Sequence, residues 1–262
     1  MLAFRLVLHA LRQLTDNART VLLLGWPSLF LAIALEFALF RPWDVSPIGP
    51  GTPEGLIALE LEGREAMPAG IFLAGQAAAF VAYLLLAVSW HRHILLAEQP
   101  QLLRRGRARQ AGGYALAFAL MGLLVGVAIV PFVIILSAPS AGYQLSMASA
   151  VSWYAVKIAA TTLSLRLMTA LPGFALRSGE PLAAAWRATR GRGGTLAIIA
   201  TLTVTMGPLA SPWTALIMAG ALQLGLLGAS VLSGMLSLLG MLIALSVLTT
   251  LWGHFVEGRA LR

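Results

Sequence analysis

The chain has 262 residues, of which 59% are hydrophobic and only 11% are charged, and its mean hydropathy is +0.85. Because soluble domains carry about 25% charged residues, this composition excludes a soluble globular protein and indicates an integral membrane protein. The formal net charge of +8 comes largely from arginines in short segments between apolar runs, a placement that sets membrane orientation and does not indicate nucleic-acid binding. The absence of cysteine excludes disulfides, thiolate catalysis and cysteine-ligated metal centres.

Residues 1–19 are predicted to form a helix that lies in the plane of the lipid headgroups. Apolar side chains repeat along one face of this helix, and Arg5, Arg12 and Asp16 lie toward the other. The apolar run 20–40 that follows is long enough to cross about 30 Å of hydrocarbon. Cleavage as a signal peptide near residues 32–34 is the alternative, but the long charged segment before the run favours a retained span.

A loop and three further spans are expected next along the chain. Residues 41–68 are rich in proline, glycine and acidic side chains, which predicts an irregular periplasmic loop. Apolar runs then predict spans at 69–90, 114–136 and 145–171.

Two basic segments accompany these spans. The first is EQPQLLRRGRARQAGG at 98–113, and the second covers 177–194. Because arginines at the ends of apolar runs contact anionic headgroups, we expect both segments to bind lipid of the cytoplasmic leaflet or a membrane-protein partner. The residues expected to make these contacts are Arg104, Arg105, Arg107, Arg109, Arg187, Arg190 and Arg192.

The last apolar tract, 195–252, contains no charged residue. It is too long for one span, and Pro208 and Pro212 interrupt it, so we expect spans at 196–213 and 229–252 with a partial or interfacial helix at 214–227. A third full span in this tract is the alternative, and it would move the C-terminus across the membrane.

The distribution of basic residues decides the topology. With six spans, only Arg41 and Arg64 lie on the side opposite the termini, and the positive-inside rule then places both termini in the cytoplasm. The sequence therefore predicts one integral membrane domain over residues 1–262. Its fold is all-α and polytopic, with about six transmembrane helices and amphipathic cytoplasmic interfacial helices, in a bacterial inner membrane.

The two basic segments also indicate an internal repeat. Each has an acidic residue near a proline, an arginine-rich helix, a Gly-Gly pair and then a span directed outward. We interpret the chain as a three-fold helical-hairpin repeat with a fainter copy at the N-terminus; chance similarity of two arginine-rich linkers is the alternative. We expect Gly112-Gly113 to break the helix before the third span, and Pro181 to occupy the first turn of a helix.

The second segment carries a resemblance to known proteins. The run EPLAAAWRATRGRGGTLAII, with LMTALPGFALRSG before it, resembles the loop before the fifth span in a broad group of six-span bacterial inner-membrane proteins. This group includes YciC-like proteins and the membrane domain fused to some glycerophosphodiester phosphodiesterases. TLWGHFVEGRALR is similar to the exit after their last span, and SWHRHILLAEQP resembles a linker of alphaproteobacterial members. The resemblance implies fold and topology and not an activity, because these 262 residues contain no soluble phosphodiesterase domain.

Ionisable side chains inside spans are costly and indicate function. Glu36, Lys157 and Arg166 are in this position. Arg166 is near enough to the cytoplasmic end of its span to extend to the headgroups, so we interpret it as an anchor. Glu36 and Lys157 are predicted to form an intramembrane pair between the first and fourth spans, which either fixes helix packing or serves transport.

All four histidines fall at predicted cytoplasmic ends of spans. His91, His93 and His254 are candidate metal ligands, but two residues spaced like His91 and His93 do not share a helical face, so we expect no metal and no cofactor. Serine-hydrolase and phosphate-loop motifs are missing, so we expect no enzyme. The sequence favours a structural or accessory membrane component that binds anionic lipid or a membrane partner; the alternatives are a small transporter using Glu36 and Lys157 and, less favoured, a lipid-modifying enzyme.

Overall fold

A computed structural model describes residues 1–40, 69–101, 106–137, 147–206 and 225–261, and these ranges contain helices and no strand. The predicted all-α fold is therefore confirmed. The helices are α1 (Leu2–Asp16), α2 (Ala18–Phe40), α4 (Ala69–Leu96), α5 (Arg107–Ser137), α6 (Met147–Met168), α7 (Leu171–Leu176), α8 (Pro181–Ala188), an unlabelled helix Gly193–Met206, α10 (Gly225–Leu251) and the π-helical turn η1 (Trp252–Val256).

Four of the described segments are long and apolar enough to cross a membrane: Leu73–Leu96, Arg107–Ile134, Val151–Leu176 and Val231–Val256. The protein is thus a multi-pass membrane protein. Two further apolar helices are shorter over the stretches that the structure describes in full, Gly193–Met206 and Ala18–Leu31, the latter being the part of α2 that precedes the first residue whose side chain is not described. The count of six spans stays a prediction, because the loop 41–68 and residues 207–224, which include most of the predicted partial helix 214–227, lie outside the described residues.

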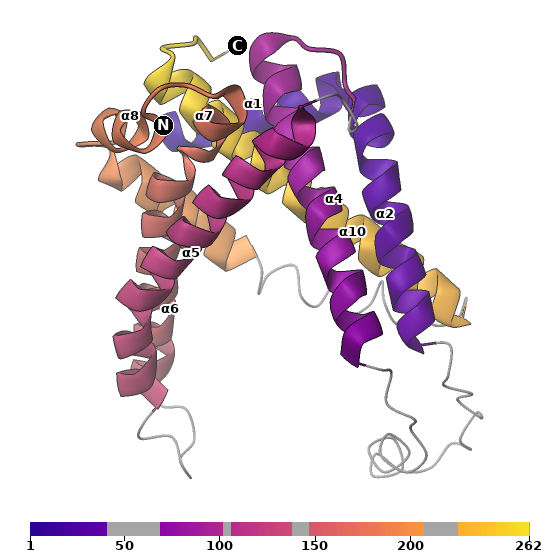
Figure 1. Cartoon of the computed structure of the whole chain (residues 1–262). Coiled ribbons are helices and arrows are strands. Elements are labelled where there is room, and N and C mark those ends of the chain that lie inside the picture. Colours follow the sequence, from indigo (N-terminus) through magenta and orange to yellow (C-terminus); the bar gives the residue numbers. More distant parts are fainter. Residues whose placement is uncertain (41–68, 102–105, 138–146, 207–224, 262) are drawn as a thin grey trace.

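Both termini lie at one end of the bundle, with α1, α7, α8 and η1 (Figure 1). We call this the N/C end. The long helices run away from it in two groups, with α5 and α6 on one side of the view and α2, α4 and α10 on the other. α2 packs against both α4 and α10, whereas α5 packs against α4, α6 and α7. α5 therefore connects the two groups.

The tightest packing is at the N/C end. The fully buried side chains there include Trp90, Leu86, Leu171 and Leu251. Farther along the bundle many large apolar side chains are exposed, as expected where lipid replaces water as the solvent. On α5 these are Leu116, Leu120, Leu123, Leu124, Val127 and Val130. The N/C end is thus the place where the fold holds polar side chains in fixed positions.

The N-terminal helix that the sequence predicts is present as α1, and it has three faces. One face is buried and packs mainly on α10; it consists of Ala3, Leu6, Ala10 and Leu14. A second apolar face is exposed and consists of Phe4, Leu8 and Leu11. The polar side chains occupy the rest of the circumference. This division is what a helix needs if it rests on protein on one side and on the lipid interface on the other.

The expectation that Gly112-Gly113 breaks the helix is wrong. α5 begins at Arg107 and continues through both glycines into the apolar span. The change of direction comes earlier, at Gly106, whose φ of +82° is in the left-handed region that favours glycine. The prediction for the second segment is confirmed, because α8 begins at Pro181. The two basic segments therefore differ in local structure. In the first segment, the residues from Arg107 onward form the first turns of α5, whereas the second segment contains the separate short helix α8.

Candidate functional site

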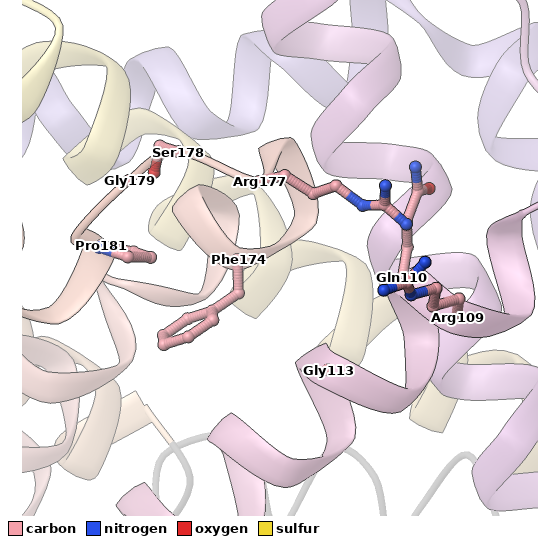
Figure 2. Close-up of a pocket in the computed structure, with 8 residues that line it drawn as sticks. All are labelled: Arg109, Gln110, Gly113, Phe174, Arg177, Ser178, Gly179 and Pro181. Atoms are coloured by element: carbon pink, nitrogen blue, oxygen red, sulfur yellow. The ribbon is translucent and has the colours of Figure 1, made fainter.

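A cavity of about 480 Å³ opens at the N/C end between the start of α5 and the α7–α8 connection (Figure 2). Two arginines and a glutamine give it donor groups, and an aromatic ring and a proline give it apolar walls. The lining residues are Arg109, Gln110, Gly113, Phe174, Arg177, Ser178, Gly179 and Pro181. We call it the arginine cavity.

The arginine cavity is positively charged. No aspartate or glutamate is among its lining residues. Arg109 and Arg177 are exposed, and within the described part of the chain neither forms an ion pair. Two guanidinium groups beside an amide and a phenyl ring suit an anion such as a phosphate group that carries an apolar chain.

The backbone at Arg177 is in an unusual conformation for this residue type. Arg177 follows the last turn of α7 with φ +58° and ψ +38°, a left-handed position that glycine usually occupies. Its N–H donates to the carbonyl of Phe174 at 3.2 Å, and the N–H of Ser178 donates to that of Gly173 at 3.0 Å. A non-glycine residue in this conformation costs roughly 1–2 kcal/mol. With the backbone in this conformation, the Arg177 side chain extends toward Arg109 and Gln110 (Figure 2).

Gly173 lets three elements approach closely beneath the cavity. A Cβ atom at this position would lie 2.7 Å from Cβ of Pro181 and 2.7 Å from Cζ3 of Trp252. Both atoms belong to buried residues, so they cannot move away easily. The close packing of α7, α8 and η1 thus depends on glycine here, and it fixes the position of the loop that carries Arg177.

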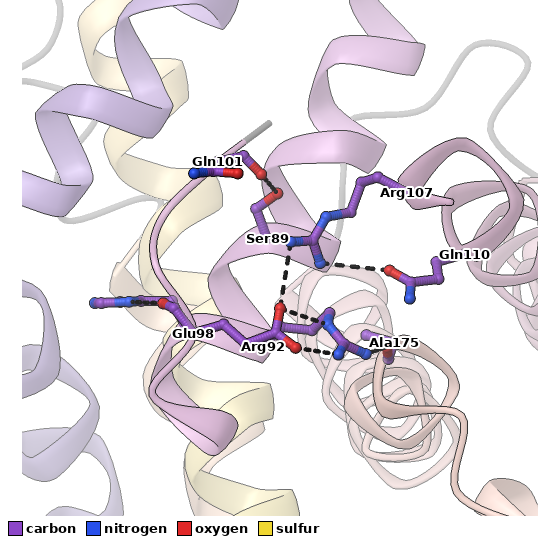
Figure 3. A network of polar contacts seen from close by, with 8 residues as sticks. Ser89, Arg92, Glu98, Gln101, Arg107, Gln110 and Ala175 are labelled. Carbon is purple, nitrogen blue, oxygen red and sulfur yellow. Dashed lines mark hydrogen bonds and ion pairs between the residues drawn. The ribbon is translucent and has the colours of Figure 1, made fainter. Parts of the chain in front are cut away.

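A partly buried ion-pair network centred on Glu98 supports the α5 side of the cavity (Figure 3). Arg92 makes a two-point pair with Glu98: its Nε donates to Oε2 at 3.0 Å and its Nη2 donates to Oε1. Nη2 of Arg107 lies 3.5 Å from the same Oε2. Arg92 also donates from Nη1 to the carbonyl of Ala175 at 3.0 Å. The network therefore joins the end of α4, the start of α5 and α7.

Arg107 and Arg109 have different roles, although both belong to the first basic segment, 98–113. Arg107 is only 3% exposed, and its guanidinium also reaches Oε1 of Gln110 at 3.4 Å. It is thus an internal partner of Glu98 and not a headgroup contact. Because Arg107 fixes the first turn of α5, it positions Arg109 at the cavity.

A second buried polar group, centred on His91, links three spans. Thr249 donates its hydroxyl proton to the carbonyl of Leu245 at 2.7 Å, so its oxygen is available as an acceptor for Nδ1–H of His91 at 2.8 Å. Nε2 of His91 then accepts from the hydroxyl of Tyr114 at 3.1 Å. This assignment gives every proton a partner and leaves the imidazole neutral. The chain Tyr114–His91–Thr249 ties α5, α4 and α10 together.

The remaining arginines of the second basic segment are exposed. Arg187, Arg190 and Arg192 all lie on the surface of the N/C end. Arg187 approaches Glu180 at 3.9 Å, but both side chains are more than 70% exposed, so this pair contributes little to stability. Arg104 and Arg105 lie outside the described residues. The described arginines of the two basic segments therefore divide into a buried one, two that line the cavity, and a surface group.

The three intramembrane candidates belong to two helices, Glu36 to α2 and Lys157 and Arg166 to α6. Lys157 is exposed on α6, with Nζ 5.8 Å from the ring centroid of Tyr154. Glu36 belongs to α2, but its side chain lies outside the described part of the structure, so the pair with Lys157 stays a prediction. Arg166 lies at the N/C end of its helix, and its guanidinium stacks 3.7 Å from the centroid of the Trp186 ring, a cation–π contact between α6 and α8.

The three histidines considered as metal ligands have different hydrogen-bond partners. His91 faces Tyr114 and Thr249, His93 lies against Asn17 and Thr20, and His254 donates to the carbonyl of Arg259. Among the residues that the structure describes, no group of three or more His, Asp or Glu side chains is arranged to hold a metal ion.

Sequence reasoning missed Arg177, Phe174 and Gln110 as parts of one site. The signal that could have found them is Pro172-Gly173 next to a basic residue, which predicts a sharp connection just where a span leaves the membrane. Comparisons of the chain with protein-family models, with curated proteins and with solved structures give no match.

Proposed function

We propose that this protein is a non-enzymatic structural or accessory component of the bacterial inner membrane that binds anionic lipid at its cytoplasmic N/C end. The observation that carries the proposal is the convergence of Arg109 and Arg177 on one cavity whose lining includes no carboxylate. A lipid phosphate would accept hydrogen bonds from both guanidinium groups, and Phe174 and Pro181 would contact the apolar part of the same lipid.

The surroundings of the cavity support this proposal. Leu182 and Trp186 of α8 are 39% and 43% exposed, and Arg187, Arg190 and Arg192 are exposed on and just after the same helix. Apolar and aromatic side chains next to basic ones are typical of helices that lie at the boundary between headgroups and acyl chains. α8 would thus hold the cavity at the depth of the phosphates.

The experiment that tests the proposal is native mass spectrometry of the protein released from nanodiscs with equal amounts of phosphatidylglycerol and phosphatidylcholine. We expect the wild type to retain phosphatidylglycerol preferentially and the double variant Arg109→Gln/Arg177→Gln to lose the preference. Arg5→Gln/Arg12→Gln is the matched control, because it removes the same charge from exposed positions of α1. Equal retention of both lipids by the wild type would exclude the proposal.

A small transporter is the second candidate, and one observation favours it. Lys157 lies in a segment long and apolar enough to span the membrane, yet it is exposed on the surface of the chain. An ammonium group in this position needs a partner, from Glu36, from a transported anion or from a second protein. Loss of an uptake activity in Lys157→Met, with unchanged folding and unchanged phosphatidylglycerol retention, would favour transport over the accessory role.

A further inference from the structure

A second cavity, of about 660 Å³, lies at the N/C end between α1, the end of α4, α10 and η1. It shares no lining residue with the arginine cavity. Its walls combine apolar surface with several polar side chains. The lining residues are His9, Gln13, Asp16, Asn17, His93, Ile94, Leu95, Ala97, Thr249, Thr250, Gly253, His254, Arg259, Ala260 and Leu261. We call it the α1 cavity.

Two buried polar atoms of this lining have no hydrogen-bond partner within the described part of the chain. These are Oε1 of Gln13 and Oγ1 of Thr250. Thr250 is only 3% exposed, and it differs from its neighbour Thr249, which donates to a carbonyl of its own helix. Buried oxygens without a partner are unfavourable, so they indicate a missing donor. Both residues line the α1 cavity, so a donor bound there is the candidate partner.

The charge of the lining favours a cation. Asp16 is exposed to the cavity region, lies one turn after Gln13 on α1, and forms no ion pair with any described residue. The one arginine of the lining, Arg259, is already compensated: its Nε donates to Glu257 at 2.6 Å and its Nη2 to the carbonyl of Leu95 at 2.6 Å. The uncompensated charge in the cavity is therefore the carboxylate.

One histidine adds an acceptor. Nδ1–H of His254 donates to the carbonyl of Arg259 at 3.0 Å, which in the neutral ring leaves Nε2 as an acceptor. His93 is already engaged on both sides: Nδ1–H donates to the carbonyl of Glu98 at 2.7 Å, and Nε2 lies 3.3 Å from Oγ1 of Thr20. The His254 ring therefore adds an acceptor nitrogen to a cavity that already has unpaired acceptor oxygens.

We propose that the α1 cavity binds a primary ammonium group. Its three N–H donors match the carboxylate of Asp16, Oε1 of Gln13 and Oγ1 of Thr250, and its charge is the one that the cavity lacks. Leu95 and Leu261 provide apolar contact for the carbon chain that bears the amine. The same chemistry is offered by a small soluble amine and by the headgroup of phosphatidylethanolamine. This site is separate from the lipid-phosphate site, and either can fail without the other.

The first arm of the test is isothermal titration of the full-length protein, purified in detergent, with ethanolamine and with choline. We expect saturable binding of ethanolamine and binding of choline that is weaker by about tenfold or more, because the quaternary nitrogen has no N–H to donate. Asp16→Asn and Thr250→Val should each weaken ethanolamine binding by about tenfold, since Asp16→Asn removes the counter-charge and Thr250→Val removes an acceptor for the ammonium N–H. Equal affinity for ethanolamine and choline would overturn the proposal, and so would an unchanged affinity in Asp16→Asn.

Matched controls test whether the effect is local. Glu180→Gln removes a carboxylate from an exposed position at the same end, and Thr162→Val removes a hydroxyl that bonds to the carbonyl of Ile158 and does not line the cavity. Both should bind ethanolamine like the wild type. A loss of binding in either control equal to that in Asp16→Asn would contradict the assignment of the site.

The second arm distinguishes the two sources of the amine. Protein from nanodiscs with phosphatidylethanolamine and phosphatidylcholine is analysed by native mass spectrometry. Retention of phosphatidylethanolamine that Asp16→Asn abolishes would assign the site to the lipid headgroup. Ethanolamine binding without such retention would assign it to a soluble amine. Absence of both would overturn the proposal.

Discussion

Nδ1 of His91 lies 2.8 Å from Oγ1 of Thr249, and the two residues are 158 positions apart in the chain. The contact is buried at the N/C end, and it continues to the hydroxyl of Tyr114. Three spans are therefore connected by a chain of hydrogen bonds in which each proton has one donor and one acceptor. A buried chain of this kind stabilises one arrangement of the helices, because any other arrangement leaves a polar atom without a partner.

We predict that Tyr114→Phe destabilises the protein by about 1–3 kcal/mol, because Nε2 of His91 is then buried without a donor. The measurement is the unfolding free energy in detergent. Tyr154→Phe is the matched control, since Tyr154 is 40% exposed and its loss of the hydroxyl should have almost no effect. Equal effects of the two substitutions would contradict the hydrogen-bond chain.

Glu98→Gln should be among the most damaging single substitutions at the N/C end. It leaves Arg92 and the 3%-exposed Arg107 without their shared counter-charge, and the loss of this partly buried partner should cost about 1–3 kcal/mol. A thermal unfolding series in detergent would show the loss as a lower melting temperature. Glu180→Gln, in which the affected pair is solvent-exposed, should change the melting temperature little.

Alanine substitutions at Gly112 and Gly173 should have different effects on stability, because the space around the two glycines differs. Gly112→Ala should leave stability unchanged or raise it by up to about 1 kcal/mol, because the position is helical and a Cβ atom there meets nothing within 4 Å. Gly173→Ala should destabilise by about 1–3 kcal/mol or more, because its Cβ atom would collide with Pro181 and Trp252. Melting temperatures of the two variants would test this difference; destabilisation by Gly112→Ala would instead support a helix break at that point.

The sequence predicted those parts of the fold that depend on hydropathy. The all-α fold and the spans of α4, α5, α6 and α10 follow from long apolar runs, which in a membrane protein have few alternatives to a helix. Pro181 at the start of α8 follows from its missing N–H. These features are local, so a single stretch of sequence is enough to predict them.

The parts that the sequence did not predict depend on backbone conformations and ion pairs that the hydropathy pattern does not encode. Arg104 and Arg107 look alike in the arginine run, and only the position of Glu98 in space makes Arg107 an internal residue. Gly112-Gly113 looks like a break, yet the helix hydrogen bonds continue through it. Arg177 could not be placed at the cavity from its sequence, because its left-handed backbone conformation is rare for arginine.

The central claim is that the arginine cavity binds lipid phosphate, and the most direct measurement is the relative association constant of spin-labelled phosphatidylglycerol over phosphatidylcholine, by electron paramagnetic resonance of the reconstituted protein. We predict a clear preference for phosphatidylglycerol in the wild type, no preference in Arg109→Gln/Arg177→Gln, and a preserved preference in Arg5→Gln/Arg12→Gln. A preference that survives in Arg109→Gln/Arg177→Gln would contradict the claim.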